Sequence, residues 1–84
     1  MKRSKIEIYA EILQAIDDGC HKPTRIMYKS NLSWVSLMKA LNILKDIEAL
    51  RVENEGKRKR CFVTEKGREI LRQYKQLAIT LRKN

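Results

Sequence analysis

The sequence predicts a single, mainly α-helical domain that carries one small β-hairpin. Apolar residues recur at helical spacing through most of the 84 residues. The chain contains one Pro and three Gly, so few residues interrupt helices. After Leu50 the spacing changes, and two short strand-like stretches flank a glycine. A chain of this length cannot divide its apolar side chains between two cores, so one structural unit is expected.

The first expected helix runs from Lys5 to about Asp18. Ser4 precedes it and Glu7 stands three residues later, which is the spacing of a capping box. Gly19 follows the helix as a typical left-handed stop. The apolar stripe of this helix comprises Ile6, Tyr9, Leu13 and Ile16.

A helix-turn-helix unit is expected next. A short helix covers about Thr24–Ser30, with Thr24 as its N-cap and Asn31 as a left-handed terminator. Ser33 then caps a third helix, which runs from Trp34 to about Leu50. The core stripe of the third helix comprises Leu37, Ala40, Leu41, Leu44 and Ile47.

The remaining segment is expected to form the hairpin and a fourth helix. Strands over Arg51–Glu55 and Lys59–Thr64 flank Gly56-Lys57-Arg58. Because two strands alone are marginal in water, this hairpin must pack on the helices. Thr64 caps the last helix, which runs to the C-terminus, and Gly67 falls in its first turn at a tolerable cost.

The charge is strongly positive and unevenly distributed. Lys and Arg number 19 against 10 Asp and Glu, for a formal net charge of +9. From Gly56 to Asn84 there are ten Lys or Arg and only Glu65 and Glu69, so most of the excess lies in the last third. Such an excess of positive charge favours binding to polyanions, and nucleic acid is the commonest polyanionic partner. The alternative is a charged surface that merely keeps the protein soluble.

The third helix is the predicted recognition helix, because the major groove admits an α-helix. Its outer face carries Val35, Ser36, Lys39, Asn42 and Asp46, with Ile43 at the margin. Ser36, Lys39 and Asn42 are the candidates for contacts to bases, since Asn pairs with adenine and Lys reaches guanine. The alternative is a plain solvated face.

Basic residues elsewhere are predicted to contact phosphates. Lys22, Arg25 and Lys29 surround the second helix together with Tyr28. Four consecutive cations, Lys57–Arg60, would repel one another unless they lie against phosphates or in the minor groove; the alternative is a charged tip that protects an edge strand. Trp34 either packs in the core under the turn, which is the favoured interpretation, or donates its indole N–H to a phosphate.

Two segments resemble a known family. Cys61–Leu71 is similar to the end of the wing and the start of the last helix in winged-helix regulators. The second segment is Thr24–Ser33, in which the stretch Ile26–Lys29 narrows the choice of family. Together they resemble small archaeal winged helix-turn-helix predicted transcriptional regulators, over nearly the whole chain. Some relatives are chromatin-associated and dimerise through a C-terminal antiparallel coiled coil. Relatives usually have Gly before the first wing strand, where this chain has Ala49-Leu50.

The resemblance implies a DNA-binding role, with the third helix as recognition helix and Gly56–Arg60 as the wing. It places Ser33, Trp34, Ser36, Lys39 and the wing cations on or near DNA. The predicted DNA-binding residues are Lys22, Thr24, Arg25, Tyr28, Lys29, Ser33, Trp34, Ser36, Lys39, Asn42, Lys57, Arg58, Lys59 and Arg60. A sequence-specific regulator and an architectural chromatin protein both fit this prediction.

The last helix is predicted to make the protein a homodimer. Residues 1–64 form the winged-helix domain, and residues 65–84 the helix that packs on it and dimerises. Apolar residues continue along the helix at spacings of four, three and four, as in a short coiled coil. These predicted interface residues are Ile70, Tyr74, Leu77 and Leu81. The alternative is that the stripe folds back over the first helix of its own chain.

Other function classes find little support in the sequence. The single His21 and the absence of a Gly-rich loop argue against an enzyme, and no cofactor or small-molecule ligand is indicated. Cys20 and Cys61 lack metal-ligand spacing, so two thiols and no metal are expected. No apolar run approaches a membrane span, and an intracellular, nucleoid-associated location is expected. RNA binding and a protein-interaction module remain as alternatives, although the low aromatic content disfavours single-stranded RNA.

Overall fold

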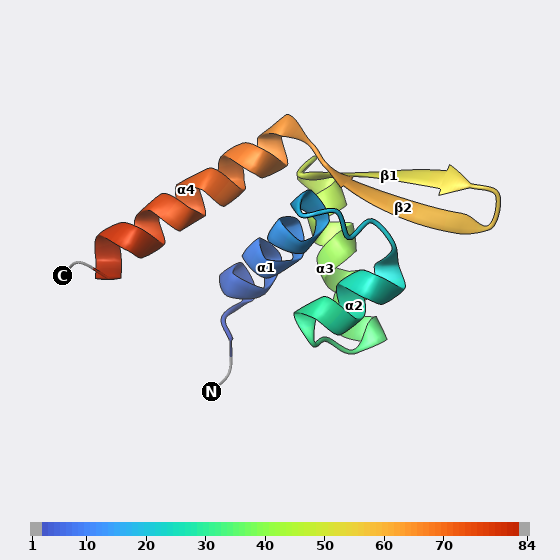
Figure 1. Cartoon of the computed structure of the whole chain (residues 1–84), viewed down its shortest axis with the longest axis horizontal. Coiled ribbons are helices and arrows are strands. Elements are labelled where there is room, and N and C mark those ends of the chain that lie inside the picture. The colour runs from blue at the N-terminus through green and yellow to red at the C-terminus, as the bar shows by residue number, and fades with distance from the viewer. Residues whose placement is uncertain (1–2, 83–84) are drawn as a thin grey trace.

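The computed structural model describes residues 3–82 and confirms the predicted order of elements. The elements are α1 (Lys5–Asp17), α2 (Pro23–Ser30), α3 (Trp34–Asp46), β1 (Leu50–Glu55), β2 (Arg58–Val63) and α4 (Glu65–Arg82). Figure 1 shows α1, α2 and α3 gathered into a helical body, from which the β1–β2 hairpin and α4 project in opposite directions. The fold is therefore mainly α with one small hairpin, as the sequence predicts.

Local signals set most helix ends. The predicted capping box at α1 is confirmed, since the Glu7 backbone N–H donates to the Ser4 hydroxyl over 3.1 Å and the Glu7 carboxylate accepts from Ser4. Asn31 ends α2 in the left-handed conformation, with φ 54° and ψ 46°. The Thr24 cap is wrong, because α2 already begins at Pro23, whose fixed φ suits the first helical position. Lys22 takes the N-cap place and makes no side-chain cap there.

The third helix is shorter than predicted. It ends at Asp46 rather than near Leu50, and Glu48 takes a left-handed conformation with φ 65°. The chain turns there because Ala49 and Leu50 are drawn into the core, where their exposed fractions are 0% and 3%. Ile47, predicted for the core stripe, is instead 42% exposed. Glu48 thus occupies a conformation that glycine adopts at little cost.

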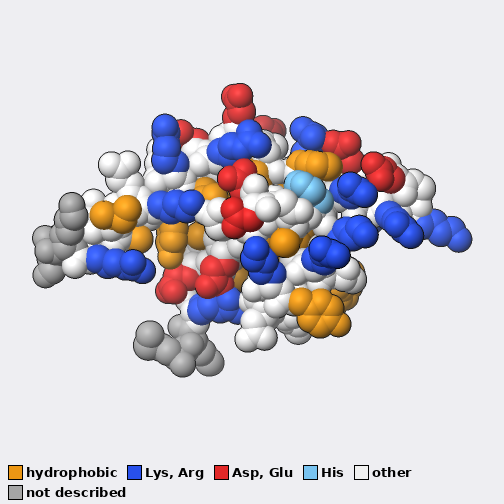
Figure 2. Space-filling model, viewed as in Figure 1, with side chains coloured by type: hydrophobic (Ala, Val, Ile, Leu, Met, Phe, Trp, Pro, Cys, Tyr) orange, Lys and Arg blue, Asp and Glu red, His pale blue; other side chains and the backbone are white. Residues whose placement is uncertain are grey.

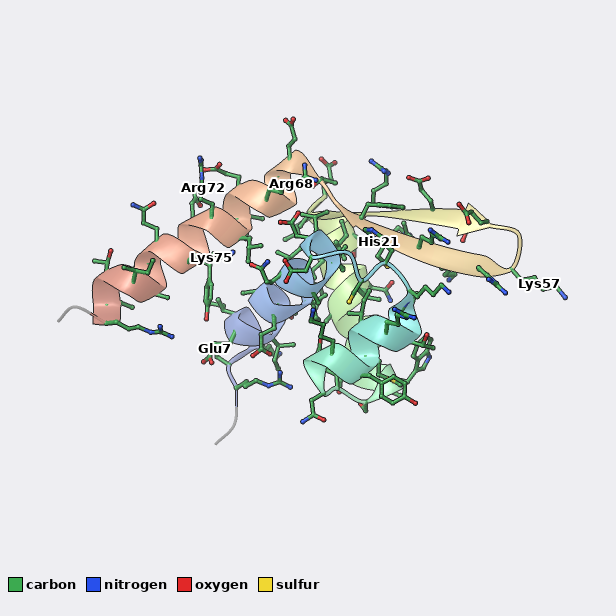
Figure 3. All side chains as sticks on the ribbon, viewed as in Figure 1. Glu7, His21, Lys57, Arg68, Arg72 and Lys75 are labelled. Atoms are coloured by element: carbon green, nitrogen blue, oxygen red, sulfur yellow. The ribbon has the colours of Figure 1, made fainter. Side chains whose placement is uncertain are left out.

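The hairpin begins inside the core and extends out of it. Its strands pair antiparallel from Leu50↔Val63 at the root to Glu55↔Arg58 at the tip, with each strand starting one residue earlier than predicted. At the root, the Cys61 backbone N–H donates to the His21 carbonyl over 2.8 Å. The His21 Nδ1 in turn hydrogen-bonds the Cys61 carbonyl over 2.9 Å. These two bonds hold the root of the hairpin to the α1–α2 loop, and Figure 3 places His21 beside that root.

The two cysteines are free thiols, Cys20 partly buried and Cys61 buried. Burial raises the pKa of the Cys61 thiol, an effect that nearby Lys59 partly opposes. Cys61 therefore behaves as a small apolar core residue rather than as a reactive group.

The step from β2 to α4 depends on close packing. Thr64 caps α4 as predicted, since its hydroxyl accepts the Gly67 backbone N–H over 3.0 Å. The same hydroxyl donates to the Glu48 carbonyl over 2.6 Å. A Cβ atom on Gly67 would lie only 2.2 Å from the Ala49 carbonyl oxygen. The expectation that Gly67 is merely tolerated is wrong, because only glycine lets the first turn of α4 pack this close to the Ala49 carbonyl.

The two halves of α4 lie in different environments. Leu71 is buried, and Ile70 and Tyr74 pack partly buried against the core, where α4 contacts α1. Further along, Leu77 and Leu81 are 58% and 64% exposed. The alternative arrangement, in which the apolar stripe folds back over the first helix of its own chain, therefore holds for the first half of α4 only. Residues 83 and 84, which the sequence places in the same helix, lie outside the described residues.

Candidate nucleic-acid interface

The outer face of α3 is solvent-exposed along its length. Leu37, Ala40, Leu41 and Leu44 are buried on one side of the helix. On the opposite side Val35, Lys39, Asn42 and Asp46 are all at least partly exposed. Two of the three predicted base-reading residues, Lys39 and Asn42, therefore face away from the core.

Ser36 is placed differently from the other two. It is exposed, but its hydroxyl accepts a 2.9 Å hydrogen bond from the Ser33 hydroxyl, and its backbone N–H donates to Ser33 over 3.2 Å. It also borders a groove against α1, lined in part by Lys5 and Ile8. Ser33 and Ser36 thus form the helix cap, which the sequence signalled for Ser33 alone.

The predicted DNA-binding residues of α2, and Lys22 just before it, are all exposed to solvent. These residues are Lys22, Thr24, Arg25, Tyr28 and Lys29. Tyr28 is the most open of the large apolar side chains, at 78%. No ion pair among residues 3–82 uses the three cations of this group. Their charge is therefore available to a polyanion.

Trp34 is not a core residue, which corrects the favoured interpretation. Its side chain is 46% exposed, whereas Leu37 and Leu41 of the same helix are buried in the core. Trp34 instead lines a groove of about 470 Å³ between α3, the start of α2 and the hairpin. The groove lining comprises Lys22, Pro23, Thr24, Trp34, Met38, Lys57, Arg58, Lys59 and Arg60. The structure thus brings cations from two separate elements to the N-terminal end of α3.

The hairpin cations differ in their surroundings, which the sequence analysis did not foresee. The strand register sets Glu53 opposite Arg60 and Glu55 opposite Arg58, and Arg60 pairs with Glu55 over 3.4 Å. Lys59 instead lies opposite the neutral Asn54. Figure 2 shows Lys and Arg side chains along the hairpin, with acidic side chains along its other edge. Pairing the strands across a two-residue turn would have revealed these carboxylates from the sequence.

Lys57 and Lys59 are the cations best placed for a phosphate. Figure 3 shows Lys57 at the tip of the hairpin, pointing away from the helical body. Within residues 3–82, neither lysine takes part in an ion pair. By contrast, Arg68 and Arg72 of α4 pair with Asp17 and Glu69. Part of the basic excess of the last third is therefore neutralised within the chain.

Two further properties concern the described residues alone. Between residues 3 and 82, no three His, Cys, Asp or Glu side chains come together in a way that could hold a metal ion. Over the same range no helix is both long and apolar enough to cross a membrane.

Comparisons with known proteins agree with this architecture. The chain is similar to Sso10a-2, a DNA-binding protein from Sulfolobus solfataricus, at 28% identity and a TM-score of 0.84. The match covers 98% of this chain and 84% of that one. AF1382 from Archaeoglobus fulgidus shares the fold at 24% identity and a TM-score of 0.76, covering 100% and 92% of the two chains.

Two uncharacterised proteins of Methanocaldococcus jannaschii are similar over part of the chain. MJ0290 is 41% identical over 51 residues and MJ0287 is 44% identical over 43 residues, or 61% and 51% of this chain. The matched segments span only 24% and 44% of those proteins. The family model described as winged helix-turn-helix matches residues 2–81. The chain belongs to the winged helix-turn-helix family.

Proposed function

We propose that the chain binds double-stranded DNA, with α3 in the major groove and the hairpin on the adjacent backbone or minor groove. One observation carries the proposal: Lys22, just before α2, and the hairpin cations Lys57–Arg60 border the same groove at the N-terminal end of α3. Phosphates on both sides of a major groove match such an arrangement. The similarity to Sso10a-2, a DNA-binding protein, supports it. Transcriptional regulation and chromatin architecture are the two roles that such binding would serve.

The helix face suggests which residues do what. Lys39 and Asn42 are the proposed base-reading residues, because both lie opposite the buried stripe. Asp46 stands at the end of the same face and would repel phosphates, so the N-terminal half of α3 enters the groove. Lys22, Arg25 and Lys29 are the proposed contacts to the phosphates of the DNA backbone. Ser33 and Ser36 contribute mainly the cap that orients this end of the helix.

The proposal is tested by titrating the protein with duplex DNA, single-stranded DNA and duplex RNA at two salt concentrations. Duplex DNA should bind most tightly, with an affinity that falls steeply as salt rises. Asn42→Ala should then cost about 1–3 kcal/mol on a preferred duplex and less on random DNA. Failure to bind duplex DNA at either salt concentration would refute the proposal and favour the alternative, a protein-interaction module.

The hairpin can be tested separately. Replacing Lys57 and Lys59 by Ala should lower the slope of log K against log salt by about one to two, given ~0.9 for each phosphate that is no longer neutralised. A matched control replaces Lys66 and Lys75 by Ala, which removes the same charge from exposed positions on α4. An unchanged slope in the hairpin variant, or an equal reduction in the control, would remove the hairpin from the DNA interface.

We also propose that the protein is a homodimer held by the C-terminal half of α4. Leu77 and Leu81 are exposed on the side of α4 that continues the packed stripe of Ile70 and Tyr74. Burying them against a second copy removes apolar surface from water and supplements a small core. Ile70 and Tyr74 already contact their own core, so they would sit at the edge of this interface. A two-fold dimer would present two recognition helices to successive half-sites.

Light scattering tests the dimer directly. The unmodified protein should be dimeric at tens of micromolar, and Leu77→Asp with Leu81→Asp should give a folded monomer with weaker DNA binding. Ile79→Asp is the matched control, because Ile79 is 55% exposed but lies about 200° around the helix from either leucine. A monomeric unmodified protein, or a monomer in the control alone, would contradict the proposal.

A further inference from the structure

An exposed apolar strip lies at the N-terminal end of α3, inside the proposed DNA interface. Val35 is 64% exposed and Trp34 46% exposed, and Met38, one turn beyond Trp34, is half-buried in the groove beside the hairpin. Trp34 and Met38 line a groove whose other residues are mostly basic, and Val35 follows Trp34 on the outer side of the helix. A single exposed apolar residue needs no explanation, whereas a contiguous group bordered by charge indicates a contact surface.

The strip has a defined place on the helix. Val35 lies on the outermost line of α3, together with Asn42 seven residues later and Lys39 beside them. Trp34 and Met38, four residues apart, lie between that line and the hairpin cations. Ile43, the other exposed apolar residue inside α3, instead borders the groove against α1. The apolar strip therefore runs from Val35, on the line of the proposed base-reading residues, through Trp34 and Met38 toward the hairpin cations.

We propose that this strip contacts thymine methyl groups and so selects T·A pairs, with Val35 as the direct contact and Trp34 and Met38 beside it. The inference rests on the proposed function. Thymine alone among the four bases presents an apolar group, its 5-methyl, to the major groove. A helix that enters this groove with an apolar outermost residue gains by burying that methyl. Asn42, on the same line, has the donor and acceptor that adenine accepts, so both residues favour T·A pairs.

Charge argues for DNA rather than a protein as the occupant. Lys22, Lys57 and Lys59 line the same groove as Trp34 and Met38, and all three cations are exposed. An apolar protein surface docked here would have to cover these cations without neutralising them, which is costly. A DNA duplex offers apolar methyls in the groove and phosphates at both edges. It therefore satisfies the strip and its cationic borders together.

The experiment compares thymine with deoxyuridine, which differs only by the missing methyl. A duplex selected from a random pool is resynthesised with each T in turn replaced by deoxyuridine, and the affinity of the full chain is measured at fixed salt. At one or two positions the affinity should fall about fourfold, which corresponds to ~0.8 kcal/mol for a buried methyl-sized group. Placing 5-methylcytosine at a neighbouring pair tests whether the position senses a methyl as such.

Two variants assign the effect to the strip. Val35→Ala should reduce the fourfold thymine preference toward one, whereas Ile43→Ala, at 44% exposure on the α1 side of the same helix, should retain it. Both positions are exposed, so both variants should fold, and circular dichroism checks this. Equal affinity of the unmodified protein for the thymine and uracil duplexes would overturn the inference, as would a selection that enriches no T·A pair. If duplex DNA does not bind at all, the proposed function fails, and that outcome is distinct from duplex binding without a methyl effect.

Discussion

The junction and the arms of this small protein are held in very different ways. The junction comprises Glu48–Leu50, Cys61–Thr64 and Gly67, where the hairpin and α4 leave the helical body. Its backbone groups are bonded across elements, as where the Thr64 N–H donates to the Ala49 carbonyl, and most of its side chains are buried. The arms, residues 53–60 of the hairpin and 75–82 of α4, are nearly all exposed. Stability should therefore depend on the junction, while the contacts of the hairpin with DNA and of α4 with a second copy should depend on the arms.

The largest effect is expected at Gly67. Gly67→Ala should lower the free energy of unfolding by about 2–3 kcal/mol, because the new methyl would press on the Ala49 carbonyl from 2.2 Å. At an exposed helix position the same change would stabilise by ~1 kcal/mol, so the sign itself is informative. Urea denaturation measures the change, with Lys66→Ala on the exposed side of the same turn as control. A Gly67→Ala variant as stable as the unmodified protein would show that the junction can yield.

This prediction also marks where sequence reasoning ends. The cap at Ser4, the stop at Asn31 and the cap at Thr64 were all predictable, because each depends on side chains within three residues. The need for glycine at position 67 was not, because it arises from a carbonyl eighteen residues away in sequence. The early end of α3 was not predictable for a similar reason, since burial of Ala49 and Leu50 outweighs helix propensity at this point of the chain.

In the candidate site, too, some features could be predicted from the sequence and others could not. The basic hairpin and the outer face with Lys39 and Asn42 could be predicted, because charge and helical period are properties of the sequence alone. The surroundings of Trp34 could not, since they depend on how the start of α2 and the hairpin pack beside α3. The carboxylates facing Arg58 and Arg60 depend on strand register. Residue types, and the cross-strand partners that a two-residue turn implies, were thus accessible from the sequence, while the neighbours of Trp34 required the fold.

A smaller effect is expected at Thr64. Thr64→Val keeps the shape of the side chain but removes the hydroxyl that bonds both Glu48 and Gly67. The free energy of unfolding should fall by about 1–2 kcal/mol, the usual range for a helix cap. Thr80→Val is the matched control, because within residues 3–82 the Thr80 hydroxyl bonds only the Gln76 carbonyl, on the exposed end of α4. Equal destabilisation of the two variants would contradict the contrast between junction and arm.

Glu48 should show a change of opposite sign. Its left-handed conformation, at φ 65°, costs a non-glycine residue ~1–2 kcal/mol, which Glu48→Gly would relieve. Part of that gain is offset because glycine makes the unfolded chain more flexible, by ~0.4–1 kcal/mol. A net stabilisation of about 0.5–1 kcal/mol should therefore raise the denaturation midpoint. Lys45→Gly, inside α3, should instead destabilise by ~1 kcal/mol, and stabilisation by both would indicate a cause other than backbone conformation.

The smallest effect on stability is expected at the hairpin tip. Lys57→Ala with Lys59→Ala should change the free energy of unfolding by less than about 0.5 kcal/mol, as is usual for exposed positions without a structural partner. Neither lysine joins an ion pair within residues 3–82, and each repels the neighbouring cations.

Arg60→Ala makes the comparison sharper, because it breaks the pair with Glu55 and should cost ~0.2–1 kcal/mol. If the lysine variant were destabilised as much as Thr64→Val, the tip would be part of the folding unit. If it stays as stable as the unmodified protein while its DNA affinity falls, the exposed tip serves binding and the junction alone bears the stability of the hairpin.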